Sequence, residues 1–153
     1  MRHLKWLQQA KRDLEAAKHL QGAGYHEWAC FLSLQAAEKA EKAYFYALEM
    51  EPPLQRGREG HDLVKLSESW PESVRSARPD LAEAQTRLNL FAENTRYPHL
   101  RVSSPPNDYV SPHEDYGDPQ SDLAIKHAEA IMEVCEKLVT AAANFALTLG
   151  KAV

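Results

Sequence analysis

The segment from Tyr25 to Glu49 constrains the fold of this chain more than any other. It contains no Gly or Pro and is dense in Ala, Leu, Glu and Lys, which are strong helix formers. Small and apolar side chains recur in it at steps of three and four, at Ala29, Leu32, Ala36, Ala40 and Ala43. This spacing places them on one face, and their small size lets a neighbouring helix approach closely. The sequence therefore predicts a central helix of a bundle.

A second stripe on this helix mixes polar with apolar side chains: Trp28, Leu32, Gln35, Lys39 and Lys42. Within it Glu38 precedes Lys42 by four positions, the favourable order for a helical ion pair, which contributes about 0.2–0.5 kcal/mol on a helix surface. Such a stripe lines a cleft, faces a dimer partner or is purely structural, and the pattern alone does not choose among these.

The composition is that of one soluble domain. The chain has 153 residues, of which 44% are hydrophobic and 26% charged, with a net charge of -4. That charge does not indicate a surface that is basic throughout, as nucleic-acid-binding proteins often have. No apolar run follows Met1 as in a secretory signal, and none reaches the roughly 18 residues of a membrane span. We expect a single domain over residues 1–153, in the cytoplasm of a prokaryotic cell.

The residues that could hold a metal lack a binding pattern. Cys30 and Cys135 are far apart in the sequence and are predicted to be buried free thiols. His99, His113 and Glu114 cluster in one segment, but no helical His-x-x-x-His pair fixes a coordination geometry. We therefore predict neither a metal site nor a cofactor.

The remaining sequence predicts four further helices, joined by loops that are rich in Pro and Gly. These helices are expected over residues 3–21, 61–69, 80–95 and about 120–149. Residues 99–121 are rich in Pro, Ser, Asp and Asn and predict a long irregular loop, and no segment predicts a strand. The expected fold class is all-α, an up-and-down helical bundle of four principal helices plus one short helix.

Several short motifs occur in a familiar order. They are Asp13-Leu14-x-Ala16-Ala17, Gln35-Ala-Ala-Glu38-Lys39-Ala-x-Lys42-Ala43, His61-Asp62-Leu63, Thr95-Arg96-Tyr97-Pro98 and an amphipathic final helix near Ala128-Glu129. Together they resemble the HEPN domain, named for higher eukaryotes and prokaryotes nucleotide-binding, over roughly residues 5–145.

The resemblance implies an all-α bundle that pairs as a homodimer. Many short prokaryotic HEPN proteins accompany a minimal nucleotidyltransferase in toxin–antitoxin-like pairs. Others are metal-independent ribonucleases, in which an Arg is followed after four to six residues by a His near the start of the penultimate or last core helix. Membership of a fold family does not distinguish between these activities, so the residues of the site have to distinguish between them.

The ribonuclease spacing occurs twice, in Arg12 with His19 and in Arg56 with His61. With nine Arg and seven His in the chain, about one match is expected by chance. Neither pair lies where the family nucleases place theirs. Arg96 is nearer that position, but His99 follows it after only two residues.

The candidate ligand-binding residues are Arg96, Tyr97, His99, His61, Lys39 and Lys42. An Arg can fork onto a phosphate and a Tyr can stack on a base. The alternative is that Arg96-Tyr97-Pro98 only ends a helix and that His61-Asp62 only starts one.

We therefore expect a non-catalytic module that binds a nucleotide or RNA, forms a homodimer and partners a minimal nucleotidyltransferase in a toxin–antitoxin-like pair. The competing hypothesis is a metal-independent endoribonuclease that acts as a homodimer. A third is a structural oligomer without a ligand.

Overall fold

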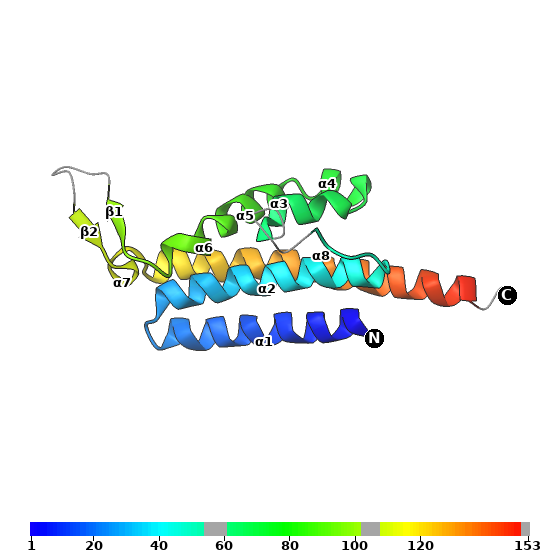
Figure 1. The fold of residues 1–153 in the computed structure, drawn as a ribbon, viewed down its shortest axis with the longest axis horizontal. Coiled ribbons are helices and arrows are strands. Elements are labelled where there is room, and N and C mark those ends of the chain that lie inside the picture. The colour runs from blue at the N-terminus through cyan, green and yellow to red at the C-terminus, as the bar shows by residue number, and fades with distance from the viewer. Residues whose placement is uncertain (54–60, 102–107, 151–153) are drawn as a thin grey trace.

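Three long helices form the body of the molecule. The structure, a computed structural model, describes residues 1–53, 61–101 and 108–150. Helices α1 (Arg2–Gly22), α2 (His26–Ala47) and α8 (Asp118–Gly150) run side by side (Figure 1). A short turn joins α1 to α2, and there Gly24 adopts a φ of +82°, which a residue without a Cβ takes easily. The helices expected over residues 3–21 and about 120–149 are confirmed, and α1 and α2 form a hairpin.

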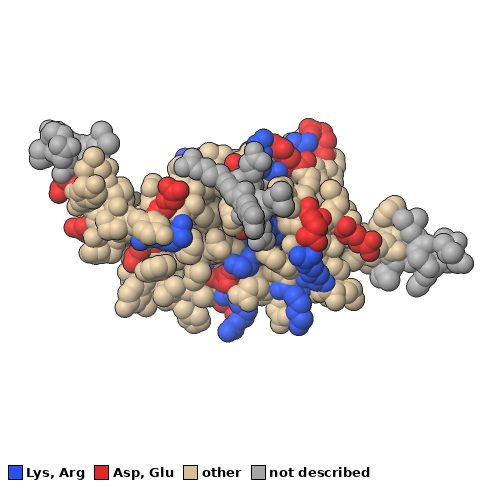
Figure 2. Space-filling view, in the orientation of Figure 1, with Lys and Arg blue, Asp and Glu red and all other residues tan. Residues whose placement is uncertain are grey.

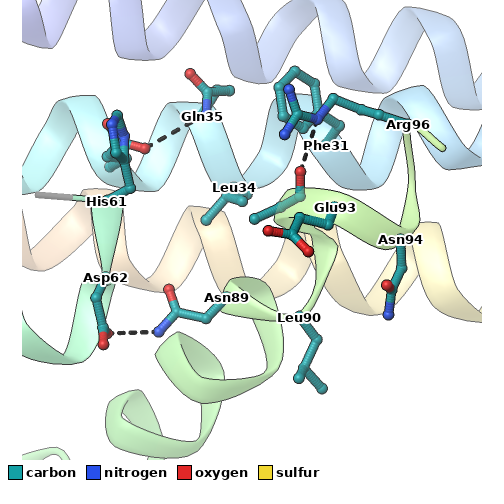
Figure 3. A pocket seen from close by; sticks show the side chains of 12 residues that line it. Phe31, Leu34, Gln35, His61, Asp62, Asn89, Leu90, Glu93, Asn94 and Arg96 are labelled. Carbon is teal, nitrogen blue, oxygen red and sulfur yellow. Dashed lines mark hydrogen bonds and ion pairs between the residues drawn. The ribbon is translucent and has the colours of Figure 1, made fainter. Parts of the chain in front are cut away.

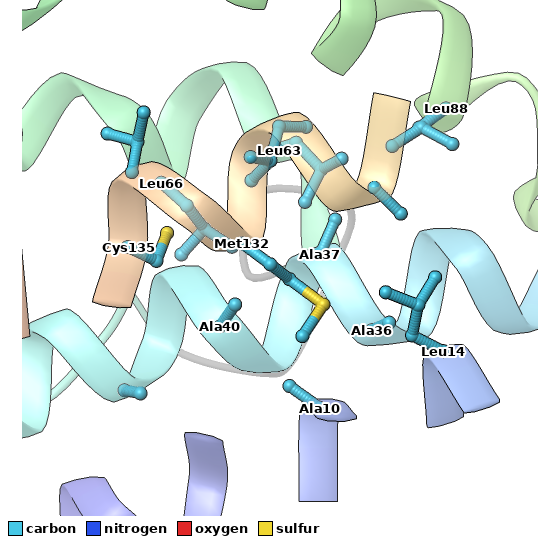
Figure 4. Close-up of a cluster of buried hydrophobic side chains, with 14 of the residues drawn as sticks. Ala10, Leu14, Ala36, Ala37, Ala40, Leu63, Leu66, Leu88, Met132 and Cys135 are labelled. Carbon is cyan, nitrogen blue, oxygen red and sulfur yellow. The ribbon is translucent and has the colours of Figure 1, made fainter. Parts of the chain in front are cut away.

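Helix α2 is the centre of this bundle. Ala36, Ala37 and Ala40 are fully buried, and Figure 4 shows Ala10 of α1 and Met132 of α8 approaching α2. Because Ala has the smallest side chain with a Cβ, the helices on both sides can pack close to the α2 backbone. The predicted central position of this helix is therefore observed.

Short helices cover another face of the bundle. They are α3 (Leu63–Leu66), the 3-10 turn η2 (Ser67–Ser69), α4 (Glu72–Ala77), α5 (Asp80–Asn89) and α6 (Phe91–Asn94). The helix expected over 80–95 is thus divided at Leu90, whose N–H bonds to Arg87 O, three residues back. Helix α4 was not predicted, because it buries no side chain and so has no apolar stripe to detect.

The segment expected to be a long irregular loop contains regular structure, so that prediction was wrong. Strands β1 (His99–Arg101) and β2 (Asp108–Val110) pair antiparallel with Leu100 opposite Tyr109. Helix α7 (Pro112–Asp115) follows, with a capping box between Ser111 and Glu114. The two strands lie at one end of the bundle and outside its core (Figure 1), so the predicted all-α bundle is confirmed.

Two further predictions concern the interior and the membrane. Both cysteines are free and buried, and burial raises the pKa of the Cys30 thiol to about 12. Among the described helices, none combines the length and the apolar character that crossing a bilayer requires.

The basic side chains of α1 are largely paired. Lys11 and Lys18 bond to Glu136 and Glu129 of α8 at 2.8 and 2.5 Å, and Arg2 bonds to Glu51. On the face shown in Figure 2, Lys and Arg lie close to Asp and Glu. These basic side chains are therefore offset by carboxylates of α8 and by Glu51, and they do not form an unpaired basic stripe on α1.

Candidate ligand-binding site

A solvent-open cleft of about 820 Å³ lies between α2 and the short helices that cover it. We call it the α2–α6 cleft. Its lining residues come from three segments of the chain: Phe31, Leu34, Gln35 and Glu38 from α2; His61 and Asp62 ahead of α3; and Asn89, Leu90, Ala92, Glu93, Asn94 and Arg96 from the α5–α6 region. The volume lies within the range of small-molecule sites.

The floor of the cleft is one face of α2. Its four lining positions are spaced at i, i+3, i+4 and i+7, so the helical period itself brings them together. Leu34 is almost completely buried, whereas Phe31 and Gln35 are partly exposed. The floor is therefore apolar toward Phe31 and polar toward Glu38.

Arg96 occupies one end of the cleft (Figure 3). Its Nε donates to Ala92 O at 2.7 Å, and its guanidinium carbon lies 5.0 Å from the ring centroid of Phe31 and 5.2 Å from that of Tyr97. These contacts hold the guanidinium through its Nε and through two rings. Its two terminal nitrogens have no hydrogen-bond partner among the described residues, so they are available to an anionic ligand.

His61 stands at the other end (Figure 3). Its Nδ1 lies 2.9 Å from Glu38 Oε1, the oxygen that also accepts a hydrogen bond from Lys42 Nζ at 2.7 Å. The Lys42 side chain is only 1% exposed, whereas that of His61 is 52% exposed. The buried carboxylate thus orients the imidazole through Nδ1 and leaves Nε2 for a ligand.

Asp62 and Asn89 fix the backbone that carries His61. Asp62 caps α3 by accepting from Val64 N at 2.9 Å, and it also accepts from the Asn89 amide at 2.7 Å. Asn89 Oδ1 in turn accepts from Leu63 N at 3.0 Å. The side chains of both residues are therefore occupied in holding α3 against α5.

A buried acid lies on α2 one turn beyond Glu38. Glu41 is fully buried, and its Oε1 accepts from Gln85 Nε2 at 2.7 Å, while Oε2 is unpaired among the described residues. Burial raises the pKa of this carboxyl group well above its ordinary value. Gln85 also accepts from Ser67 Oγ at 3.2 Å, so the chain of hydrogen bonds continues into η2.

The structure brings some of the predicted site residues together and separates others. Arg96 and His61 line the same cleft, and Tyr97, which is 60% exposed, lies beside Arg96 but is not among the lining residues. Lys39 does not line it, because its Nζ donates to Asp13 on α1 at 2.6 Å. Lys42 does not line the cleft either, because its side chain is buried and its Nζ donates to Glu38.

His99 lies outside the cleft as well. It belongs to β1, and its Nε2 is 2.9 Å from Asp115 Oδ2 in α7. Phe31 and Glu93 are among the lining residues that the sequence reasoning missed, and only the α2 spacing carried a signal for the first of them. Within the part of the chain that the structure describes, no group of three or more His, Cys, Asp or Glu is placed to hold a metal ion.

The three long helices, of which α1 runs antiparallel to α2 and α8, and their cover of short helices define an all-α bundle domain. This chain belongs to the HEPN domain family, whose model matches residues 3–138. The resemblance seen in the sequence motifs is thereby confirmed. No curated protein matches the chain.

Solved structures share the fold. The chain is similar to TT1696 from Thermus thermophilus, with 29% identity, a TM-score of 0.73 and coverage of 90% of this chain and 98% of that one. It is similar to ST0689, an archaeal HEPN homologue, with 31% identity, a TM-score of 0.67 and coverage of 90% and 97%. It is also similar to a HEPN domain protein from Thermotoga maritima, with 26% identity, a TM-score of 0.61 and coverage of 89% of this chain and 98% of that one.

Proposed function

We propose that this HEPN protein is a non-catalytic nucleotide-binding and interaction module. It works as a homodimer, with a minimal nucleotidyltransferase as its partner in a toxin–antitoxin-like pair. One observation carries the ligand-binding part of the proposal. Arg96 and His61, which are distant in the sequence, line one solvent-open cleft whose floor is apolar at Phe31 and Leu34. A guanidinium at one end and an imidazole at the other suit a ligand that has a phosphate and a base.

The nuclease-spaced pairs do not support a catalytic role. Arg12 lies on the exposed side of α1 and pairs with Glu15 at 3.3 Å, away from the cleft. Arg56 lies outside the described residues, so the Arg56–His61 pair is a matter for experiment.

A metal-independent endoribonuclease is the second candidate, and one contact favours it. Glu38 holds His61 through Nδ1 in the orientation in which Nε2 can take a proton from an RNA 2′-hydroxyl. Arg96, in the same cleft, would stabilise the charge that develops on the phosphate. This candidate requires the scissile phosphate to lie between the two residues.

RNA cleavage and thermal stability separate the two candidates. Purified protein is incubated with single-stranded RNA in EDTA, and its melting temperature is measured with and without nucleotides. We expect no cleavage and a rise in melting temperature with nucleotide. Cleavage that Arg96→Ala or His61→Ala abolishes would establish the nuclease instead. Arg87→Ala is the matched control, since Arg87 lies on the exposed side of α5 and does not line the cleft.

Two exposed apolar side chains, one in the lining of the cleft and one in contact with its Phe31, support the proposed assembly. Trp28 of α2 is 44% exposed and Leu90, between α5 and α6, is 64% exposed. We expect the homodimer to bury them, so light scattering should give twice the monomer mass and Trp28→Glu with Leu90→Glu should give the monomer. A nucleotidyltransferase encoded beside this gene should co-purify with the wild-type protein.

A further inference from the structure

The number of phosphates that the α2–α6 cleft accepts depends on its charged groups. Three carboxylates line it, those of Glu38, Asp62 and Glu93. Glu38 is paired with the buried Lys42, while Asp62 accepts its hydrogen bonds from backbone N–H groups and the Asn89 amide. Glu93 is exposed.

Few cations oppose these carboxylates. Lys39 is turned toward Asp13, and the Nδ1 of His61 is occupied by Glu38. The buried Lys42 therefore offsets Glu38, and Arg96 stands against the two remaining carboxylates, those of Asp62 and Glu93. Arg96 is the only Lys or Arg among the lining residues that the structure describes, and its two terminal nitrogens are unpaired there, so the cleft offers one guanidinium fork, which fits one phosphate.

The direction in which a di- or triphosphate extends from Arg96 does not change the conclusion that the cleft fits one phosphate. In Figure 3 Glu93 lies beside Leu34, below the Arg96 guanidinium. A chain that runs inward from Arg96 would bring its second phosphate toward the carboxylates of Glu93 and Glu38, and like charges at short range repel. A chain that runs outward would leave its added phosphates in solvent, where they gain nothing.

We infer that the α2–α6 cleft recognises a single phosphate ester of a nucleotide, either of a free nucleoside monophosphate or of the terminal nucleotide of an RNA strand, and gains no affinity from the further phosphates of nucleoside di- and triphosphates. This inference rests on the proposed nucleotide-binding function. The phosphate lies on the Arg96 fork, the sugar and base extend over Leu34, and the Nε2 of His61 meets the polar edge of the base.

Calorimetry on the full chain tests this inference. The ligands are the four common nucleosides with their mono-, di- and triphosphates, at fixed ionic strength, with EDTA and again with Mg²⁺. At least one monophosphate should bind about tenfold more tightly than its nucleoside, which is what one charge-assisted contact of roughly 1.4 kcal/mol provides. Its di- and triphosphate should bind no more tightly than the monophosphate does.

Two substitutions make the test specific. Arg96→Ala should bring the monophosphate down to the affinity of the nucleoside, whereas Glu93→Gln should improve the triphosphate relative to the monophosphate. Glu68→Gln is the matched control, because Glu68 is an exposed carboxylate outside the cleft. Circular dichroism and melting confirm that each variant is folded.

The outcomes separate this inference from the function on which it rests. Affinity that rises with every added phosphate overturns the single-phosphate recognition and leaves nucleotide binding intact. Absence of binding by every ligand overturns both. Oligoribonucleotides with a terminal phosphate or hydroxyl identify the source: binding by free monophosphate assigns the free nucleotide, and binding by the phosphorylated strand alone assigns the strand end.

Discussion

Glu38 and Lys42, one turn apart on α2, form an ion pair of 2.7 Å in which the two side chains are 7% and 1% exposed. An ion pair at this spacing on an exposed helix surface contributes little to stability, but here both charged groups are buried away from water. The partners of a buried pair depend on each other, since either one alone is an uncompensated charge in the interior. His61, which shares Glu38 Oε1, is the only one of the three that reaches solvent to a large extent.

Lys42→Met should therefore destabilise the fold by about 3–5 kcal/mol, because it leaves the Glu38 carboxylate buried without its ammonium partner. Urea unfolding followed by circular dichroism measures the loss. Lys137→Met is the control, since it breaks an i,i+4 pair of similar length with Glu133 on the exposed side of α8 and should leave the midpoint unchanged. Equal losses in the two variants would contradict a buried role for Lys42.

Glu41→Gln should make the fold more stable at neutral pH. The pKa of Glu41 is raised in the folded state, so its contribution is complete below the unfolded-state pKa near 4.5 and is lost as pH rises toward the folded value. Gln cannot ionise, and it can still accept the hydrogen bond from Gln85. The difference in unfolding free energy between variant and wild type should grow from pH 4.5 upward and then level off. A constant difference across that range would show that Glu41 is ionised in the fold.

Asp62→Ala should cost about 1 kcal/mol, because α3 loses its N-cap. Asp62→Asn should cost less, since an amide oxygen can still accept from Val64 N. Unfolding midpoints measure both changes. If the two variants lose the same stability, the carboxylate acts through its charge and not through the cap.

Ala40→Leu should destabilise the bundle by about 1–3 kcal/mol, because α2 is packed closely at this fully buried position. Ala141→Leu, the same change at an exposed position of α8, is the comparison and should have little effect. Thermal melting of both proteins checks the difference. An unaffected Ala40→Leu would mean that the helices can move apart without loss.

The sequence predicted the long helices well and the pairing across the site poorly. Helices α1, α2 and α8 carry apolar side chains at helical steps over five or more turns, and their observed ends lie within two or three residues of the expected ones. Strands β1 and β2 have three residues each, too few for an alternation to be read. The burial of Lys42 was missed because spacing along α2 shows which residues share a face and not what covers that face.

The candidate site depends both on helical periodicity, which the sequence shows, and on packing between helices, which it does not. The four α2 residues of the cleft floor follow the helical period, but the meeting of Arg96 with His61 depends on how α3 and α6 pack on α2. Such long-range contacts leave no periodic signal in the sequence. The motifs His61-Asp62-Leu63 and Thr95-Arg96-Tyr97-Pro98 identified the participants, and only the fold shows that two of them share one cleft with Phe31.

The length of α8 has a consequence for its own dynamics. In Figure 1 its C-terminal turns run past the ends of α1 and α2, and from residue 141 onward none of its described side chains is buried. Turns without a packing partner open and close without the rest of the protein unfolding. Deuterium should therefore replace the amide protons of residues 143–148 far sooner than those around Ile131, and the bundle should tolerate truncation there.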